Sequence, residues 1–316
     1  MLHNKKIGVV IPAFQEAERI GAVISTMPAF VDHIYVIDDS STDGTGDRAR
    51  STAPVGTTTV TVHRHDSNRG VGAAIVTGYE LGISAGDDVL AVMAGDAQMD
   101  PAELATVVQP VIDGAADYVK GNRFHYGTAW EVMPRYRFIG NAILSLLTKI
   151  ASGYWKLSDF QTGYTAISRE AARTIPLRKL YRRYGFPNDL LVKLNVLNAR
   201  VHEVPIKPIY QGEKSGIRIA HVVPRISWLL VKDFFWRMRE KYVVRDFHPL
   251  VFFYFFGFMS FIVGFVFGLY LLMYRIVTGP VSETSALFAA LFFLFGTQSL
   301  FFAMWFDMES NKDLQQ

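Results

Sequence analysis

The chain contains no cysteine among its 316 residues. Disulfides and thiolate metal sites are therefore excluded, and the composition fits a reducing compartment. The formal net charge is only +3, and the basic excess gathers directly before the first of two apolar stretches. So small and local an excess gives no reason to expect a nucleic-acid partner.

Charge is missing altogether from two long stretches near the end of the sequence. No Asp, Glu, Lys or Arg occurs from Pro249 to Tyr274 or from Thr284 to Phe306. Each run exceeds the roughly 20 residues needed to cross a bilayer core. A buried core helix could imitate one such run, but two in succession, with aromatic ends, predict two transmembrane helices at about 249–274 and 284–306.

Basic residues flank the first charge-free run on one side, whereas the short connection from Arg275 to Glu283 contains a single basic residue. This asymmetry predicts a multi-pass integral membrane protein whose large N-terminal part faces the cytoplasm. The polar start MLHNKK has no apolar core of a signal peptide. The basic residues that precede the first span are Lys232, Arg237, Arg239, Lys241 and Arg245.

The segment Pro224–Tyr242 has an amphipathic helical pattern. Its basic residues recur every seven positions, opposite an apolar stripe, which predicts a helix lying on the membrane surface. We therefore expect a large cytoplasmic domain at 1–220, an interfacial helix within 221–246 and a membrane domain at 247–316. The basic positions are Arg225, Lys232 and Arg239, and the apolar ones are Ile226, Leu230, Phe234 and Met238.

The first 205 residues alternate between short β-branched or apolar runs and segments with helical spacing. This alternation predicts an α/β fold with a Rossmann-like, mostly parallel sheet that binds ligands at the carboxyl ends of its strands. The expected strands are Ile7–Ile11, Ile34–Ile37, Thr57–Val62, Val89–Met93, Asp117–Lys120, Tyr164–Ile167 and Arg200–Val204. Helices are expected at Glu16–Met27, from Ala73, from Pro101, at Phe138–Ile150 and after a cap at Asn188 or Asp189.

The stretch VLAVMAGDAQMDP, Val89–Pro101, places an acidic turn directly after a buried strand. Asp96 and Gln98 offer hard oxygen ligands two residues apart, which suit Mg²⁺ or Mn²⁺ held mainly by the phosphates of a nucleotide. The following helix should have Asp100 as its N-cap and Glu103 as capping partner. Taken alone, the turn fits a metal site no better than the plain alternative, in which Asp100 only caps the helix and Asp96 only ends the strand.

Other polar groups follow the remaining strands. The pair Gly70 and Gly72 could let backbone approach a nucleotide, or could mark a tight turn. Arg123 closes a strand at the same predicted edge, and the basic, glycine-bounded loop YQGEKSGIRI contains Lys214. The glycine pair is a weak signal when taken alone.

Five motifs occur in a fixed order: VIPAFQE, VIDDSSTDGT, NRGVGAA, GDAQMDP and SDFQTGY. Together they resemble the inverting glycosyltransferases of family two, and with the two spans the chain is most similar to the polyprenyl-phosphate (dolichol-phosphate) hexose synthases. The resemblance implies a GT-A fold, a nucleotide-diphosphate sugar donor such as UDP-glucose or GDP-mannose, a polyprenyl or dolichyl phosphate acceptor in the lipid bilayer, and Mg²⁺ or Mn²⁺.

The resemblance also implies roles for individual residues. Asp96 and Gln98 would hold the metal, and Asp159 and Gln161 would lie near the acceptor, so that Asp96, Asp159 and Gln161 form the catalytic set. The implied nucleotide ligands are Pro12, Ala13, Glu16, Asp38 or Asp39, Asn68 and Gly70. The implied phosphate-binding cations are Arg123, Arg135 or Arg137, and Lys214, although Arg135 and Arg137 would equally suit lipid headgroups.

One position departs from the family pattern, which commonly has Asp-x-Asp at the acidic turn. Here Ala94 replaces the first acid. Water can fill an octahedral position of Mg²⁺, so weaker metal binding is expected rather than its loss. The replacement leaves a second reading open, that of a catalytically degenerate nucleotide-sugar-binding scaffold. A polysaccharide synthase is disfavoured because two spans are too few for a polymer channel and no Gln-x-x-Arg-Trp motif occurs.

Transfer to a lipid phosphate needs little general-base help, because the second pKa of a phosphate monoester is about 6. Asp159 is therefore expected to position the acceptor or the sugar during in-line attack with inversion, while Lys214 closes over the phosphates. The glycines of the first span offer faces on which copies could pack into a homo-oligomer. These are Gly257, Gly264 and Gly268.

Overall fold

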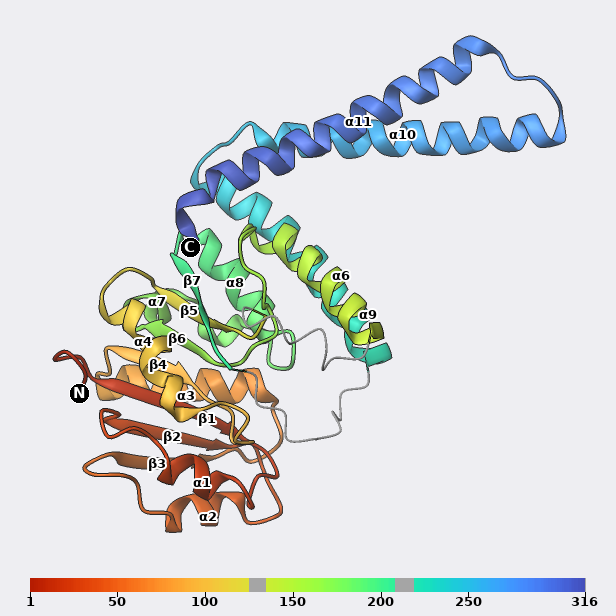
Figure 1. Cartoon of the computed structure of the whole chain (residues 1–316). Coiled ribbons are helices and arrows are strands. Elements are labelled where there is room, and N and C mark those ends of the chain that lie inside the picture. The colour runs from red at the N-terminus through yellow and green to blue at the C-terminus, as the bar shows by residue number, and fades with distance from the viewer. Residues whose placement is uncertain (125–134, 208–218, 316) are drawn as a thin grey trace. The chain divides into compact units, whose positions relative to one another are not determined.

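This computed structural model describes residues 1–124, 135–207 and 219–315, with the backbone alone for 135–143 and 219–222. It divides into two compact units, Met1–Phe234 with Asp313–Gln316, and Phe235–Lys312. The first unit contains a seven-stranded sheet in the order β3-β2-β1-β4-β6-β5-β7 (Figure 1). The strands are β1 Ile7–Ala13, β2 His33–Asp38, β3 Thr59–Arg64, β4 Val89–Val92, β5 Tyr118–Asn122, β6 Thr165–Ser168 and β7 Val201–Pro205.

All neighbouring strands run parallel except β6, which is antiparallel to both β4 and β5. The central strands β1 and β4 are buried and almost wholly apolar, as expected of strands covered on both faces. The edge strand β3 is largely exposed, with the sequence TVTVHR. All seven expected strands are present, so the predicted mostly parallel α/β sheet is confirmed.

Helices cover both faces of the sheet. The residues of α1 (Ile20–Ser25), α2 (Thr45–Ser51) and α4 (Leu104–Ile112) pack in one apolar core, and those of α3 (Val71–Ala85), α7 (Arg169–Thr174) and α8 (Phe186–Val196) pack in the other. Helix α3 lies close to the strands because Gly78 faces Val10, where a Cβ would clash. Helix α6 (Arg135–Ser152) belongs to the same unit.

The start of helix α8 and the capping partner of Asp100 differ from the sequence prediction. Helix α8 begins after Gly185 rather than after a cap at Asn188 or Asp189, because Pro187 occupies its first turn and the Asp189 carboxylate accepts the Tyr181 amide at 2.7 Å. Asp100 is the N-cap of the short 3₁₀ helix η1 (Pro101–Glu103), as predicted. The Glu103 carboxylate, however, accepts the amide of Lys207.

Helix α9 (Ile219–Arg239) contains the amphipathic pattern. The stripe that was expected to face lipid is buried inside the protein, with Ile226 and Leu230 only 4% and 2% exposed. A different set, Trp228, Val231 and Phe235, is exposed. The apolar face of α9 therefore packs on protein, because an amphipathic period alone does not distinguish a protein core from a lipid surface. The placement of α9 at the membrane surface stays a prediction.

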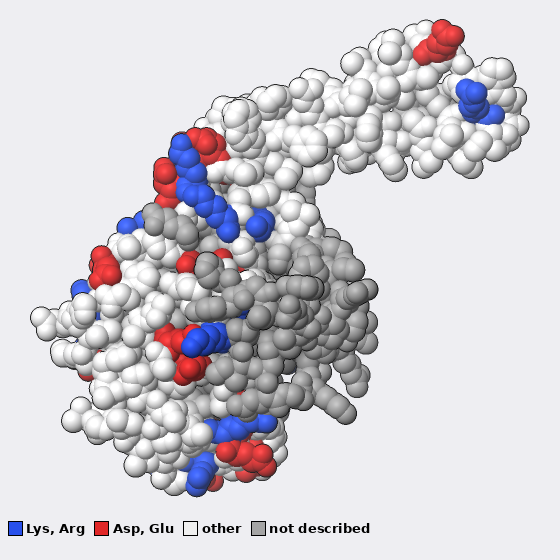
Figure 2. All heavy atoms as spheres, viewed as in Figure 1, with Lys and Arg blue, Asp and Glu red and all other residues white. Residues whose placement is uncertain are grey.

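The second unit is a hairpin of two long apolar helices, α10 (Leu250–Val277) and α11 (Glu283–Ser310). Their backbones meet at glycines: a Cβ at Gly264 would clash with Phe293, and one at Gly296 with Phe261. Figure 2 shows that charged atoms occur only toward the ends of this hairpin. Both helices are long and apolar enough to cross a membrane, in agreement with the two predicted spans.

A buried polar cluster closes the base of the hairpin. The Arg237 guanidinium forms two hydrogen bonds to the Asp307 carboxylate, at 2.8 and 2.9 Å, and both side chains are fully buried. The Tyr242 hydroxyl donates to the same carboxylate at 2.6 Å. Lys241 donates to the Asn311 side chain at 2.7 Å. Because buried charges are stable only when paired, the cluster fixes the end of α11 against the segment before α10.

Candidate active site

The reversed direction of β6 determines what meets at the carboxyl edge of the sheet. Val92, at the end of β4, pairs with Thr165, at the start of β6. The residues that follow β4 and those that precede β6 therefore lie at the same edge. A Cβ at Gly163 would lie 3.2 Å from Met99 Cε, and the Tyr164 hydroxyl donates to the Asp100 carbonyl at 3.0 Å. The acidic turn and the SDFQTGY segment are thus in contact.

The acidic turn is a tight structure held by its own groups. The Gln98 amide donates to Asp96 Oδ1 at 3.1 Å, and Ala97 between them has φ 59°. The Ala94 amide donates to Met99 Sδ at 3.3 Å. This geometry brings the Asp96 carboxylate and the Gln98 amide side chain, both half-buried, to one turn at the end of β4.

The loop after β1 is fixed by side chains from the loop after β2. Ser41 Oγ accepts the Gln15 amide at 3.0 Å, and Thr45 Oγ1 accepts the Glu16 amide at 2.9 Å. Asp43 accepts the Ala17 amide at 3.0 Å. The VIPAFQE and VIDDSSTDGT motifs therefore form one hydrogen-bonded corner that contains Pro12, Ala13 and Glu16.

The two acids at the end of β2 have different surroundings. Asp39 is 3% exposed. Its Oδ1 accepts from His65 Nδ1 at 2.8 Å and from the Arg69 amide at 2.9 Å, and its Oδ2 accepts the Gly70 amide at 2.7 Å. Asp38 is fully buried and accepts the Ser41 amide at 2.8 Å. Asp39 thus organises the NRGVGAA loop that contains Asn68 and Gly70.

The glycines of this loop make room for the chain itself. Gly70 has φ 96°, and a Cβ there would lie 2.5 Å from the Arg182 carbonyl oxygen. A Cβ at Gly72 would lie 2.5 Å from the Tyr181 carbonyl oxygen. The segment 181–182 therefore packs against the start of α3, an approach that only glycine allows.

Asp159 and Arg123 form a two-pronged ion pair at the same edge. Arg123 Nε donates to Asp159 Oδ2 at 2.7 Å and Nη2 to Oδ1 at 2.9 Å. Burial alone would raise the pKa of Asp159, but the hydrogen bonds and charge of Arg123, together with Lys120, hold this pKa below its ordinary value. Asp159 is 1% exposed, whereas the Arg123 side chain is 27% exposed. The arginine is therefore the member of the pair that can meet a ligand.

Gln161 follows in the same segment. Its backbone amide donates to Asp159 Oδ1 at 3.3 Å. Its side-chain Nε2 is buried and has no hydrogen-bond partner in the described part of the chain. A buried donor without a partner is costly, so this amide is suited to a group that the folded chain does not itself provide.

Three candidate cations from the sequence are not placed. Helix α6 contains Arg135 and Arg137, but their side chains belong to the part that is described by backbone alone. Lys214 lies outside the described residues.

A family model described as glycosyl transferase family 2 matches residues 8–175, more than half of the chain. The chain belongs to glycosyltransferase family 2. Curated relatives include the UDP-N-acetylglucosamine–dolichyl-phosphate N-acetylglucosaminyltransferase of Methanococcus voltae, 30% identical over 66% of this chain and 87% of the relative. The undecaprenyl-phosphate mannosyltransferase of Micrococcus luteus is 30% identical over 70% of this chain and 93% of the relative.

Solved structures show the GT-A fold for this glycosyltransferase. Mannosyl-3-phosphoglycerate synthase from Rubrobacter xylanophilus aligns with TM-score 0.54 at 17% identity, over 78% of this chain and 77% of the other. Glucosyl-3-phosphoglycerate synthase from Mycobacterium tuberculosis, solved with Mn²⁺ and UDP, aligns with TM-score 0.54 at 19% identity, over 74% and 80%. The predicted fold is thereby confirmed.

Two ionisable residues of the glycosyltransferase, one fully buried and one half-buried, were not singled out from its sequence. Lys120 is fully buried, and its Nζ donates to the Thr162 carbonyl at 3.3 Å, while burial lowers its pKa to about 8. Glu203 Oε1 accepts the amides of Ser158 and Asp159 at 2.8 and 2.9 Å, and burial raises its pKa. Both hold the segment that contains Asp159. The signal that could have found Lys120 is a lysine inside an apolar strand.

Proposed function

We propose that this glycosyltransferase transfers a hexose, with inversion, from UDP-glucose or GDP-mannose to a polyprenyl or dolichyl phosphate. The observation that carries the proposal is the contact between the acidic turn that contains Asp96 and the segment that contains Asp159. This contact brings potential metal ligands and Arg123 to the same edge of the sheet. The names of the relatives support a lipid-phosphate acceptor, and one of them adds N-acetylglucosamine to the donors to be tested.

The donor would bind at the corner formed by the loops after β1 and β2. Pro12, Ala13, Glu16 and the Asp39 loop would surround the nucleoside. Because both Asp39 oxygens accept hydrogen bonds from the chain, a base could reach this acid only by sharing or replacing a donor. The backbone of the NRGVGAA loop would then complete the nucleotide site.

The donor set at the acidic turn fits a divalent cation. The described residues contain no group of three or more His, Cys, Asp or Glu able to hold a metal. A cation here would therefore depend on Asp96, Gln98, water and the diphosphate oxygens, which matches the preference of Mg²⁺ or Mn²⁺ for hard oxygens. When bound, the ion would supply positive charge to the departing nucleoside diphosphate.

In the proposed reaction an oxygen of the lipid phosphate attacks the anomeric carbon. The new C1–O bond to the lipid phosphate forms as the C1–O bond to the nucleoside diphosphate breaks, and no proton transfer is required. Arg123 would bind phosphate oxygens, while Asp159, buried and ionised, would hold Arg123 in place. Asp159 is thus proposed as a positioning residue rather than a base. Lys214, and Arg135 or Arg137, are proposed as further phosphate contacts.

The membrane parts suit this acceptor. We propose that α10 and α11 span the bilayer, that the catalytic unit faces the cytoplasm and that α9 lies at the interface, so that enzyme and lipid phosphate meet in two dimensions. The spans would also allow a homo-oligomer.

The test is transfer of radiolabelled sugar from UDP-glucose, GDP-mannose and UDP-N-acetylglucosamine into organic-extractable polyprenyl phosphate. Purified full chain is used with Mg²⁺ or Mn²⁺, and EDTA serves as the control. Metal-dependent label in the lipid phase with one donor supports the proposal and identifies the sugar. Ala94 motivates the alternative, a degenerate nucleotide-sugar-binding scaffold, which predicts nucleotide binding without lipid label from any donor.

A further inference from the structure

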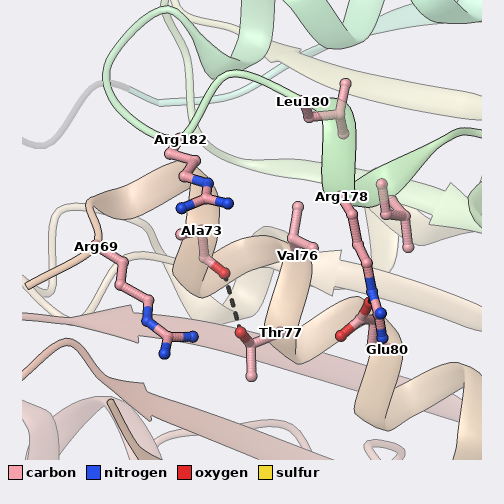
Figure 3. A pocket seen from close by; sticks show the side chains of 9 residues that line it. Arg69, Ala73, Val76, Thr77, Glu80, Arg178, Leu180 and Arg182 are labelled. Carbon is pink, nitrogen blue, oxygen red and sulfur yellow. Dashed lines mark hydrogen bonds and ion pairs between the residues drawn. The ribbon is translucent and has the colours of Figure 1, made fainter. Parts of the chain in front are cut away.

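A groove of about 450 Å³ lies between α3 and the segment 177–182, apart from the residues proposed for catalysis. Figure 3 shows its lining side chains, which come from the start and outer face of α3 and from the 3₁₀ helix η2 (Leu177–Lys179) and the residues after it. The lining residues are Arg69, Ala73, Val76, Thr77, Glu80, Leu177, Arg178, Leu180 and Arg182.

Helix α3 presents a different stripe to this groove from the one on the sheet. Gly78 and Gly82 face Val10 and Leu90 of the strands. Ala73, Thr77 and Glu80, spaced three and four residues apart, form one outward stripe. The groove is therefore separated from the sheet by the body of the helix.

The groove has an excess of positive charge. Arg178 Nε donates to the Glu80 carboxylate at 2.9 Å, so the single acid of the lining is already paired. In Figure 3 the Arg69 side chain extends toward Thr77, and the Arg182 side chain lies near Ala73 at the start of α3. Among the residues that the structure describes, neither Arg69 nor Arg182 forms an ion pair with an acid. An adjoining hollow shares Glu80 and Arg178 and adds Arg173 and Lys179.

The backbone of each arginine is held by a hydrogen bond to the chain. The Arg69 amide donates to Asp39 at 2.9 Å, and the Arg182 carbonyl accepts the Ala73 amide at 3.2 Å. The Thr77 hydroxyl already donates to the Ala73 carbonyl at 3.1 Å, so the two guanidinium groups are the donors that suit the oxygens of a phosphate group.

A chain of hydrogen bonds leads from the groove to the corner after β2. Thr77 Oγ1 is 3.0 Å from His65 Nε2, and His65 Nδ1 is 2.8 Å from Asp39 Oδ1. His65 and Asp39 are each only 3% exposed. A ligand that contacts Thr77 and Arg69 therefore contacts the partners of Asp39, Arg69 directly and His65 through Thr77.

We propose that this groove is a second anion site that binds a phosphate group, and that its occupancy changes nucleotide affinity through Thr77, His65 and Asp39. The second half rests on the proposed nucleotide site at Asp39. The phosphate group belongs either to a free anion or to the headgroup of an anionic lipid, and the donor chemistry is the same for both.

Binding is tested first without nucleotide or metal. Full chain in phosphatidylcholine nanodiscs is titrated with inorganic phosphate by calorimetry, with EDTA present. The double variant Arg69→Gln/Arg182→Gln should bind phosphate at least about fivefold more weakly. The matched control Arg50→Gln/Arg200→Gln, which removes two exposed cations elsewhere, should bind like the wild type. Equal phosphate affinity in the double variant and the wild type would overturn the site.

Coupling is tested by UDP and GDP affinity with and without phosphate. In the wild type, phosphate should change the UDP or GDP affinity by at least about fivefold. This change should be lost in the double variant and in Thr77→Val, and retained in Thr77→Ser. A change that persists in the double variant would mean competition at the diphosphate site and would refute the coupling. If nanodiscs that contain phosphatidylglycerol change the nucleotide affinity in the absence of free phosphate, the phosphate group belongs to a lipid headgroup. Absence of nucleotide binding under all conditions would refute the proposed function and the coupling. The phosphate titration would still show whether the groove binds phosphate.

Discussion

At the scale of single residues, the Arg123–Asp159 pair is the feature on which the proposed chemistry most depends. Asp159→Asn keeps the shape of the side chain but removes the charge that orients Arg123. We expect sugar transfer to fall by about tenfold or more, with nucleotide affinity changed by less than about threefold. Steady-state kinetics with separate kcat and KM, together with a nucleotide titration, measure both quantities.

A matched control exists at the opposite end of the same strand. Asp117 precedes β5 and accepts two guanidinium hydrogen bonds from Arg200, both at 3.2 Å, in an exposed pair. Asp117→Asn should leave transfer within about twofold, because exposed pairs contribute little. Full turnover in Asp159→Asn would show that the orientation of Arg123 does not depend on this acid.

Ala94 gives the second residue-scale prediction. Restoring an acid with Ala94→Asp adds a hard ligand two residues before Asp96, so the Mn²⁺ concentration for half-maximal transfer should fall by about tenfold. A metal titration of initial rates measures this, with Ala94→Asn as the uncharged control. An unchanged midpoint would place the metal away from this turn.

The residues at the site differ in how far sequence could predict them. Asp96, Gln98, Asp159 and Arg123 follow strands within ordered motifs, and their meeting at one edge follows from strand order. The contacts of Glu203 and Lys120 with the Asp159 segment could not be predicted, because they join positions about 40 residues apart through the pairing of β5 with β6 and β7.

At the scale of elements, the contact between α9 and α8 contains a buried acid. Asp233 is 3% exposed and lies by Lys193 of α8, 3.4 Å away, and burial with the charge of Asp189 raises its pKa to about 6. Between about pH 4 and 6 the folded state binds this proton more tightly than the unfolded state. The free energy of unfolding should therefore fall as pH rises through this window.

Removal of this titration should flatten the pH dependence. The free energy of unfolding of Asp233→Asn should rise relative to that of the wild type as pH increases from about 4 to 7, by about 1–3 kcal/mol at most. Melting curves of the detergent-solubilised full chain followed by tryptophan fluorescence check this, with the exposed Asp246→Asn as control. A constant difference across the range would mean that Asp233 does not titrate there.

Helix α10 of the hairpin contains two glycines whose substitution by alanine should have different effects on stability. A Cβ at Gly264 would clash with the Phe293 backbone, whereas one at Gly268 would lie 4.0 Å from Ala289. Gly264→Ala should destabilise the hairpin by about 1–3 kcal/mol, and Gly268→Ala should be nearly neutral. Melting points in detergent measure the difference, and equal values for the two variants would contradict this packing.

Sequence predicted these elements unevenly. Strand positions and both long apolar helices were correct because apolar runs of the right length have few alternative explanations. The start of α8 and the lipid-facing stripe of α9 were wrong, since both depend on tertiary partners: Asp189 is occupied by Tyr181, and Ile226 and Leu230 are buried in the protein. Local pattern contains no information on such partners.

At the scale of the whole molecule, the absence of cysteine makes membrane topology directly testable. Single cysteines at Ser51, at the end of α2, and at Ser282, between α10 and α11, should react differently with an impermeant maleimide added to intact cells. Ser282→Cys should be labelled and Ser51→Cys protected until the membrane is opened. Labelling of Ser51→Cys from outside would reverse the proposed orientation.

The antiparallel strand β6 has a consequence for how such an enzyme can diversify. Strand β6 separates two parallel blocks of the sheet: β3, β2, β1 and β4 on one side, and β5 and β7 on the other. The loops proposed to select the nucleotide belong to the first block. Asp159 precedes β6, and Arg123 follows β5 of the second block. A chimaera joined between Val92 and Tyr118 could therefore exchange donor preference while keeping its acceptor, as two interchangeable modules on one scaffold.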